Sequence, residues 1–489
     1  MTPSVTPLLA LVVPLAGAAL VSATGSRPNL REAVSIITGI ALFGLVASLY
    51  PPVLAGDHPT VILARPIAGL DLKLAVEPLG LLFATVASGL WIATTVYSIG
   101  YMRGNGEDHQ TRFYACFAIS IAAAVGVAFS GNMLTLFVFY EVLTLSTFPL
   151  VTHKGTDEAR RGGRTYLGLL LTTSIGFLLF AIIWTYLLAG TLDFVPGGIL
   201  RGKASHGTLV VLLALYMFGI GKAALMPFHR WLPAAMVAPT PVSALLHAVA
   251  VVKAGVFTVL KVAIYIFGID TLHRTGASEA FMWLAAFTLL AASLVAMTRD
   301  NLKARLAYST ISQLSYVVLG AMLANAMGVI GSGMHIAMHA FGKITLFFCA
   351  GAIYVAAHKT EISDMRGLGR VMPVTMGAFL IGSLSIIGLP PMGGMWSKWF
   401  LALGTVDSGH LALLAALMIS SLLNVAYLLP IPIRGFFGAV PDGAATEIHE
   451  APMPMLIALG ITALGCVVLF LFPQGPYHLM RMIVTGAAG

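Results

Sequence analysis

Charged residues are scarce in this chain of 489 residues, since Asp, Glu, Lys and Arg together make up only 9% of it. Soluble domains carry roughly a quarter of their residues as these four types, so the shortage excludes an ordinary soluble protein. Hydrophobic residues make up 58% of the chain, and the mean hydropathy is +0.93. The composition therefore predicts a protein that crosses a membrane many times.

Cysteine is also rare, and the three residues of this type stand far apart in apolar stretches. Their isolation excludes a CxxC metal or iron–sulfur motif and a disulfide framework within this chain. Basic runs with interleaved aromatic residues are missing, which argues against nucleic acid as a partner. The N-terminal apolar stretch lacks the basic flank of a signal peptide, so we expect it to form a first spanning helix.

The apolar stretches predict an all-α polytopic membrane protein. A transmembrane helix needs about 20 apolar residues, and about fourteen stretches meet this requirement. No linker between them is long enough to separate soluble domains, so we expect residues 1–489 to form a single transmembrane domain. The expected helices lie near residues 4–22, 32–52, 78–100, 112–130, 132–151, 165–189, 207–226, 240–267, 279–298, 304–325, 327–356, 372–403, 409–433 and 453–473.

Lysines and arginines are distributed unequally between the loops. If the chain crosses the membrane fourteen times, one set of alternate loops carries sixteen of these residues and the other set carries six. Cytoplasmic loops hold the excess of positive charge in membrane proteins. We therefore expect the richer side to be cytoplasmic and both termini to lie on the opposite face.

Residues 216–267 join two long apolar stretches through a polar segment that prolines interrupt. Lys222 precedes the break at Pro227, and Lys253 lies near the middle of the helix that follows it. A lysine deep in hydrocarbon costs about 2.5–3.5 kcal/mol or more, so such residues usually have a function. Broken helices at membrane depth are tolerated where they line a cavity or pack on protein. The two lysines therefore indicate a path for ions.

Glu141 is the only acid well inside an expected span. An unpaired carboxylate there would be costly, so a lysine should lie near it, and Lys222 is the first candidate. Separation of such a pair would drive the lysine to release its proton. The alternative is a purely structural pair between two helices.

His335, His339 and Lys343 follow one another at intervals of four residues. This spacing places them on one face of a helix with a step of about 6 Å. Histidines titrate near neutral pH, which suits a proton relay. Structural hydrogen bonding is the alternative. We expect no metal, because a third ligand is missing, and no haem, because histidines on a facing helix are missing.

Three further residues within the spans are candidates. Lys398 follows a second break at Pro390-Pro391, which predicts two related halves, but it could also be an interface lysine between two tryptophans. Lys261 lies about 12 Å beyond Lys253 on one helix and could simply snorkel to the interface. His247 lies on a different face of that helix and is a secondary candidate.

Five segments resemble the antiporter-like subunits of respiratory NADH dehydrogenase, Mrp-type Na⁺/H⁺ antiporters and membrane-bound hydrogenases. The resemblance covers nearly the whole chain. It implies two inverted five-helix repeats, helices 4–8 (about 112–267) and 9–13 (about 279–433), with helices 7 and 12 broken. The segments are GNMLTLFVFYEVLTLSTFPL (131–150), KAALMPFHRWLPAAMVAPTPVSALLHAVAVVKAGV (222–256), NLKARLAYSTISQLSYV (301–317), HIAMHAFGKITLFF (335–348) and GLPPMGGMWSKW (388–399).

The same resemblance implies roles in a proton path for the residues already singled out. These are Glu141 on helix 5, Lys222 on helix 7, Lys253 on helix 8, His335, His339 and Lys343 on helix 11, and Lys398 on helix 12. Tyr140 stands where the family usually has tryptophan, and some relatives carry glutamate in place of Lys398. In size the chain is similar to the D-type member of Mrp-type antiporters, and we expect no long lateral helix or extra domain.

We therefore predict a proton-translocating subunit of a multisubunit complex in a bacterial or archaeal cytoplasmic membrane. The first hypothesis is the D-type member of a Mrp-type cation/proton antiporter. The alternative is a proton-pumping subunit of a redox-driven complex. We expect other membrane subunits as partners, protons as cargo with Na⁺ as a second candidate, no cofactor, and no catalytic chemistry in this chain. A cofactor-binding redox subunit and a stand-alone solute transporter are further alternatives.

Overall fold

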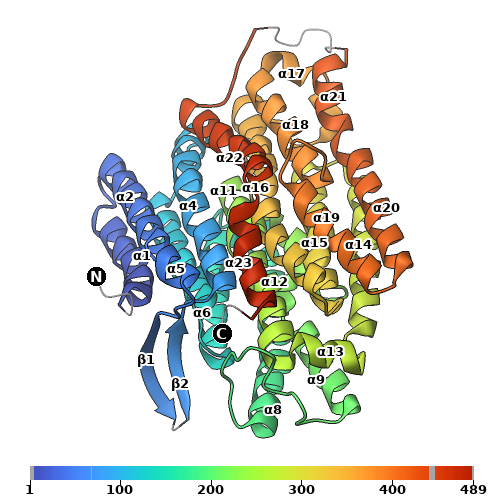
Figure 1. Cartoon of the computed structure of the whole chain (residues 1–489). Coiled ribbons are helices and arrows are strands. Elements are labelled where there is room, and N and C mark those ends of the chain that lie inside the picture. The colour runs from blue at the N-terminus through green and yellow to red at the C-terminus, as the bar shows by residue number, and fades with distance from the viewer. Residues whose placement is uncertain (1–4, 68, 440–446, 487–489) are drawn as a thin grey trace.

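The computed structural model describes residues 5–67, 69–439 and 447–486, and most of them are helical (Figure 1). The α-helices are α1 Thr6–Ala23, α2 Pro28–Ala47, α3 Tyr50–Leu54, α4 Pro78–Gly104, α5 Gln110–Ala128, α6 Met133–Val151, α7 Asp157–Thr173, α8 Leu179–Ala189, α9 His206–Gly219, α10 Trp231–Ala234, α11 Thr240–Ala244, α12 Val251–Lys261, α13 Ile269–Thr275, α14 Glu279–Met297, α15 Leu302–Met322, α16 Ala326–Ala357, α17 Leu368–Val371, α18 Pro373–Ile387, α19 Gly394–Asp407, α20 Leu411–Leu428, α21 Pro430–Phe437, α22 Met453–Leu471 and α23 Gln474–Val484. Short 3₁₀ segments are η2 Gly221–Ala223, η3 Ala235–Val237 and η6 Ile362–Met365, and π-helical segments are η1 Ser174–Leu178, η4 Leu245–Val249 and η5 Val262–Phe267.

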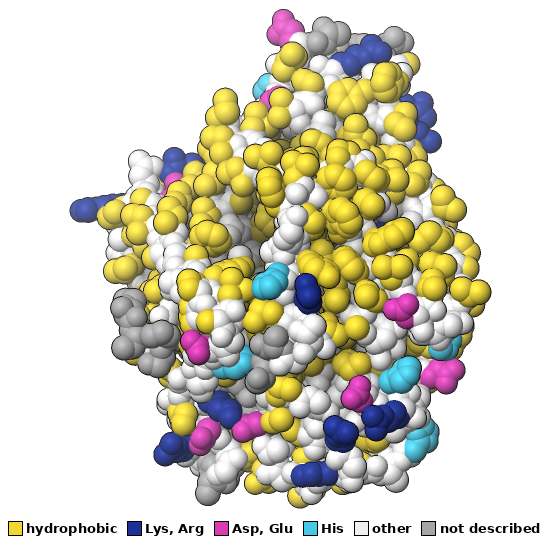
Figure 2. Space-filling model, in the orientation of Figure 1, with side chains coloured by type: hydrophobic (Ala, Val, Ile, Leu, Met, Phe, Trp, Pro, Cys, Tyr) yellow, Lys and Arg dark blue, Asp and Glu magenta, His cyan; other side chains and the backbone are white. Residues whose placement is uncertain are grey.

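Long apolar helices dominate the described residues, as the composition predicts. Eleven of these helical stretches are long and apolar enough to cross a membrane, and two shorter apolar helices are α9 and α18. Figure 2 shows hydrophobic side chains over the middle of the visible face, with most charged side chains toward its two ends. This arrangement is that of a multi-pass membrane protein.

A β-hairpin departs from the all-α prediction. Strands β1 (Thr60–Ile67) and β2 (Leu70–Ala75) pair antiparallel and extend from one end of the helix bundle (Figure 1). The sequence LDLKLA alternates apolar and polar residues, which is the period of a strand and not of a helix. Asn132 binds the hairpin through a hydrogen bond to the Asp71 carbonyl (2.6 Å), and the Lys73 ammonium pairs with Asp193 (2.8 Å). The hairpin is thereby fixed to the start of α6.

Asparagine caps begin two of the helices that carry candidate residues. The Asn132 side chain accepts a hydrogen bond from the Thr135 amide (2.8 Å) at the start of α6. The Asn325 side chain accepts one from the Gly328 amide (2.8 Å) at the start of α16. Such caps satisfy backbone donors that the first turn leaves free. They fix where Glu141 and the histidines lie along their helices.

Two interruptions divide long apolar stretches, and the first differs from its prediction. Helix α9 ends at Gly219, so Lys222 lies in the 3₁₀ turn η2 and not in the predicted helix 207–226. The Gly221 carbonyl in this turn accepts hydrogen bonds from the Trp231 indole (2.9 Å) and from the Ala224 amide (3.0 Å). The second interruption, between α18 and α19, lies at the predicted Pro390-Pro391.

Helix α16 forms the centre of the bundle. Its 32 residues pack against α15, α18, α19 and α22, and also against α12. Most of its side chains are buried, including both histidines and Lys343. The polar face of α16 therefore lies inside protein, away from lipid.

Candidate functional site

Four intramembrane lysines are fully buried, with 0–1% of their surface exposed, and Lys398 is 8% exposed. The four are Lys222, Lys253, Lys261 and Lys343. Buried amines in a membrane must find polar partners inside the protein, because hydrocarbon offers none. The partners of each lysine therefore outline the polar interior of this chain.

Lys222 is held against α6. Its Nζ donates to the Tyr140 carbonyl (2.8 Å) and to Thr144 Oγ1 (2.5 Å), and it lies 3.2 Å from the centre of the Tyr140 ring. Helix α12 approaches this turn so closely that a Cβ on Gly255 would overlap the Lys222 backbone. Tyr140, which replaces the tryptophan usual in the resemblance, is thus the principal neighbour of Lys222.

Glu141 does not form the direct ion pair that we expected with Lys222. Both residues are described, and no Lys222–Glu141 contact within 4.0 Å is present. Tyr140 and Thr144 share one face of α6, and Glu141 lies about 100° further round the helix. Both carboxylate oxygens of Glu141 are inaccessible and lack a hydrogen-bond partner among the described residues.

Lys253 and His339 connect α12 to α16. The Lys253 Nζ on α12 lies 2.5 Å from the His339 Nδ1 on α16. Both side chains are buried. A lysine and a histidine at this distance can pass a proton between them, and either can hold it.

His335 continues from His339 toward the second interrupted helix. The two rings stack with centroids 5.7 Å apart, and the His335 Nδ1 lies 2.8 Å from Ser397 Oγ on α19. Tyr316 also stacks with His335, with ring centroids 5.6 Å apart. The predicted pair of histidines on one helical face is therefore present.

Lys343, one step further along α16, turns toward α15. Its Nζ donates to Ser309 Oγ (2.6 Å), and the Tyr427 hydroxyl donates to the same oxygen (2.8 Å). Tyr427 also forms a hydrogen bond with Asn424. Lys343 thus contacts a separate polar cluster formed by residues of α15 and α20.

Lys398 points into the protein. Its Nζ donates to the Ile387 carbonyl (3.0 Å) and to Ser421 Oγ (3.1 Å), and it lies 4.6 Å from the centre of the Tyr316 ring. An interface lysine would direct its ammonium to lipid headgroups and water. The contacts therefore favour an internal role, beside an apolar cavity of about 620 Å³ that Lys398 and Trp399 help to line.

The two secondary candidates behave differently. His247 lies in η4 against Phe347, with ring centroids 4.7 Å apart, and neither ring nitrogen has a partner among the described residues. Lys261 does not snorkel: its Nζ pairs with Glu77 Oε1 at 2.9 Å, and Lys261 is 1% exposed. Sequence reasoning missed Glu77, although it stands directly before an apolar run that starts at Pro78.

The family model described as NADH:quinone oxidoreductase/Mrp antiporter, TM, matches residues 130–424, which include all seven residues of the expected proton path. The chain belongs to this family. The N-type member of the NADH-quinone oxidoreductase of Desulforudis audaxviator is 31% identical, and the alignment covers 96% of both chains. A probable K⁺/H⁺ antiporter protein of Rhizobium meliloti, of the combined A/B type, is also 31% identical over 96% of this chain, which spans 47% of that relative. A chain of the Mrp complex from Dietzia sp. DQ12-45-1b has the same fold, with a TM-score of 0.88, 20% identity and coverage of 100% and 98%.

In this member of the antiporter family, the described residues form a nearly continuous polar row across the bundle. It runs from Lys253 through His339 and His335 to Ser397, and Tyr316 connects His335 to Lys398. The Nε2 atoms of both histidines have no partner among the described residues, so each ring keeps one nitrogen available for proton exchange.

Proposed function

We propose that this chain is a proton-translocating, antiporter-like subunit of a multisubunit membrane complex. The observation that carries the proposal is the Lys253–His339 contact of 2.5 Å, because it joins buried titratable side chains of α12 and α16, one from each proposed repeat. Such contacts move protons through a low-dielectric interior without exposing an unpaired charge to lipid. The family to which the chain belongs supports this reading.

The proposed route starts at Glu141 and Lys222, passes to Lys253, and crosses to His339 and His335. It ends at Lys398. Lys343 lies on the same face of α16 and belongs to the path as a branch toward Ser309. Helix α12, which carries Lys253, packs closely against the η2 turn, which carries Lys222.

The architecture that we propose has fourteen membrane crossings and two inverted repeats, about 112–267 and 279–433, within one domain. The two interrupted helices support the repeats, because one lies in each half. The unequal loop charge supports a location of both termini on the non-cytoplasmic side. The β-hairpin then lies on that same side.

The complex itself has two candidates. A Mrp-type cation/proton antiporter, with this chain as its D-type member, agrees with the likeness to a chain of the Dietzia Mrp complex over nearly full length. A redox-driven pump is favoured by the full-length match to an NADH-quinone oxidoreductase subunit. Purification with intact partners decides between them: a flavin or nickel–iron subunit indicates the redox pump, and several small membrane subunits indicate the antiporter.

The test of the function uses Glu141→Gln and Lys222→Ala in everted membrane vesicles that contain the whole complex. Each variant should abolish ion-coupled proton flux while the complex still assembles, and Glu141→Asp should keep part of the flux because its charge survives. Asp157→Asn is the matched control, because the Asp157 side chain is 86% exposed. Normal flux in Glu141→Gln would contradict the proposal.

A further inference from the structure

A second buried acid lies at the end of the bundle that carries the β-hairpin. Glu77, only 8% exposed, accepts hydrogen bonds from the amides of Leu79 (3.0 Å) and Gly80 (2.8 Å) at the start of α4. Its Oε1 lies 2.9 Å from Lys261 Nζ, and its Oε2 accepts a hydrogen bond from the Tyr265 hydroxyl at 3.0 Å. We refer to Glu77, Lys261 and Tyr265 as the hairpin-side cluster.

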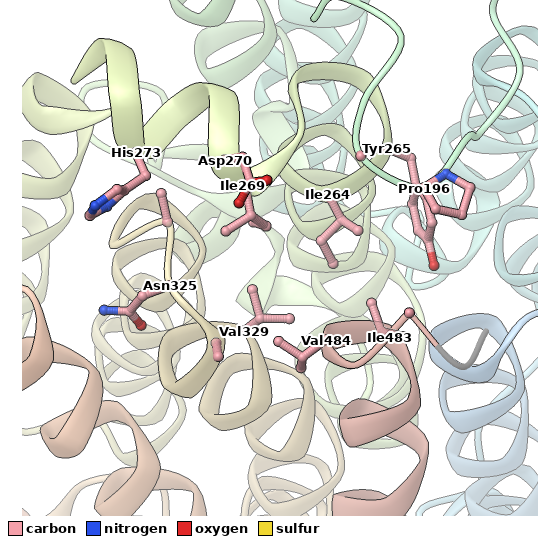
Figure 3. A pocket seen from close by; sticks show the side chains of 14 residues that line it. Pro196, Ile264, Tyr265, Ile269, Asp270, His273, Asn325, Val329, Ile483 and Val484 are labelled. Atoms are coloured by element: carbon pink, nitrogen blue, oxygen red, sulfur yellow. The ribbon is translucent and has the colours of Figure 1, made fainter. Parts of the chain in front are cut away.

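A cavity of about 410 Å³ adjoins this cluster (Figure 3). Tyr265 stands at its side next to Pro196, while Asp270, His273 and Asn325 lie at another part of the wall. Asp270 and His273 are exposed, whereas Tyr265 is only 6% exposed. The cavity thus has a polar, solvent-facing part and a buried wall that contains a partner of Glu77.

We propose that the hairpin-side cluster is an ion-access site, at which protons enter or leave the path from the face that carries the β-hairpin. This proposal rests on the proposed function, because the hairpin-side cluster would connect Lys253 of the proton path to one face of the protein. Lys261 and Lys253 lie on one helix eight residues apart, which is about 12 Å along its axis. The family match begins at residue 130 and does not include Glu77.

The chemistry of the site is a proton relay. When a hydronium ion in the cavity gives a proton to the Tyr265 oxygen and becomes water, the tyrosine passes its own hydroxyl proton to Glu77 Oε2 and remains neutral. Protonated Glu77 no longer attracts the Lys261 ammonium, which can then give one proton inward toward Lys253 and be replenished by Glu77. Each cycle moves one proton and leaves all three side chains as they began, and it runs equally well in the opposite direction.

A purely structural role would give the cluster different properties. A capping carboxylate with a buried lysine would only hold α4 against α12, and its loss would reduce stability. The chain contains a matched pair for comparison. Glu32, 4% exposed, accepts from Arg103 Nε at 3.0 Å and lies on α2, away from the polar row.

The first experiment measures ion-coupled proton flux per assembled complex in vesicles with Glu77→Gln, Lys261→Gln or Glu32→Gln. Glutamine keeps one acceptor oxygen, so residue 77 can still accept one of the two amide hydrogen bonds at the start of α4. We expect Glu77→Gln and Lys261→Gln to lower flux by about tenfold or more, since a positioned proton-transfer group contributes about 10²–10⁴. Glu32→Gln should lower the amount of complex but not its flux. Normal flux in both Glu77→Gln and Lys261→Gln would overturn the proposal.

The second experiment tests the cavity with a membrane-impermeant thiol reagent applied from the hairpin side. Val484→Cys places a thiol in the cavity wall, and Arg65→Cys, whose native side chain is 72% exposed on β1, is the control. We expect the label to block flux at residue 484 and to leave flux unchanged at residue 65.

Absence of labelling at residue 484, or labelling without loss of flux, would overturn the access site. Its failure is distinguishable from failure of the proposed function, because the function is contradicted by normal flux in Glu141→Gln and not by any result at the hairpin-side cluster.

Discussion

Replacement of Lys398 by arginine separates a proton-transfer role from a role of charge alone. The Lys398 ammonium reaches the Ile387 carbonyl and Ser421 Oγ across 3.0 and 3.1 Å, and an arginine can donate to the same two oxygens. The adjacent cavity of about 620 Å³ has room for the larger guanidinium. Lys398→Arg therefore keeps charge, donors and packing, and removes only the ability to become neutral.

The size of the effect follows from the neutral fraction. The ordinary pKa of an arginine side chain lies at least about two units above that of lysine, so the neutral form is at least about a hundredfold rarer. Burial disfavours the charged form of both side chains in the same sense. If transport needs a neutral residue 398 in every cycle, Lys398→Arg should lower flux by about a hundredfold or more.

Proton flux in everted vesicles, normalised to assembled complex, is the assay. Lys73→Arg is the matched control, because the Lys73 ammonium only pairs with Asp193 at 2.8 Å on the hairpin. It should transport like the parent chain. If Lys398→Arg also transports at the parent rate, Lys398 is a fixed charge and the proton leaves the row elsewhere.

Further substitutions test other parts of the row and its packing. His339→Ala should slow flux by about tenfold. This effect is smaller than the usual contribution of a proton-transfer group, because water can partly replace the ring next to Lys253. Unchanged flux would show that His339 is not part of the path. Stoichiometric zinc or iron that is lost in His339→Ala would show that the histidines bind a metal. Gly255→Ala should destabilise the solubilised complex by about 1–3 kcal/mol, because its methyl group overlaps the Lys222 backbone. Gly168→Ala, with open space around its Cβ, should raise or preserve the melting temperature.

The sequence allowed prediction of features that depend on short-range pattern. The interval of four residues was enough to place His335 and His339 on one face, and the proline pair was enough to locate the break before Lys398. The helical membrane fold was also predictable, because the length of each apolar stretch is a local property of the sequence. These features are local, because helix periodicity and backbone chemistry determine them.

Partners across large separations could not be predicted in the same way. Lys261 and Glu77 lie 184 residues apart in sequence, and nothing near either residue indicates their pairing. Tyr140 and Glu141 lie about 100° apart around α6. Which of them Lys222 contacts therefore depends on the rotation of α6 and on where α9 ends. Helix α9 ends at Gly219, and Lys222 in the turn that follows contacts Tyr140.

The row from Lys253 to Lys398 has an electrical consequence. Its members come from α12, α15, α16 and α19, so a proton that passes along it moves mainly sideways between helices, and only the His339–His335 step of about 6 Å runs along a helix axis. Membrane voltage does work only on displacement along the membrane normal, about 2.3 kcal/mol per charge per 100 mV for a full crossing. The sideways steps are therefore insensitive to voltage. Apart from the His339–His335 step, the membrane voltage acts on the two segments that connect the row to the opposite faces, so voltage affects mainly the entry and exit of protons.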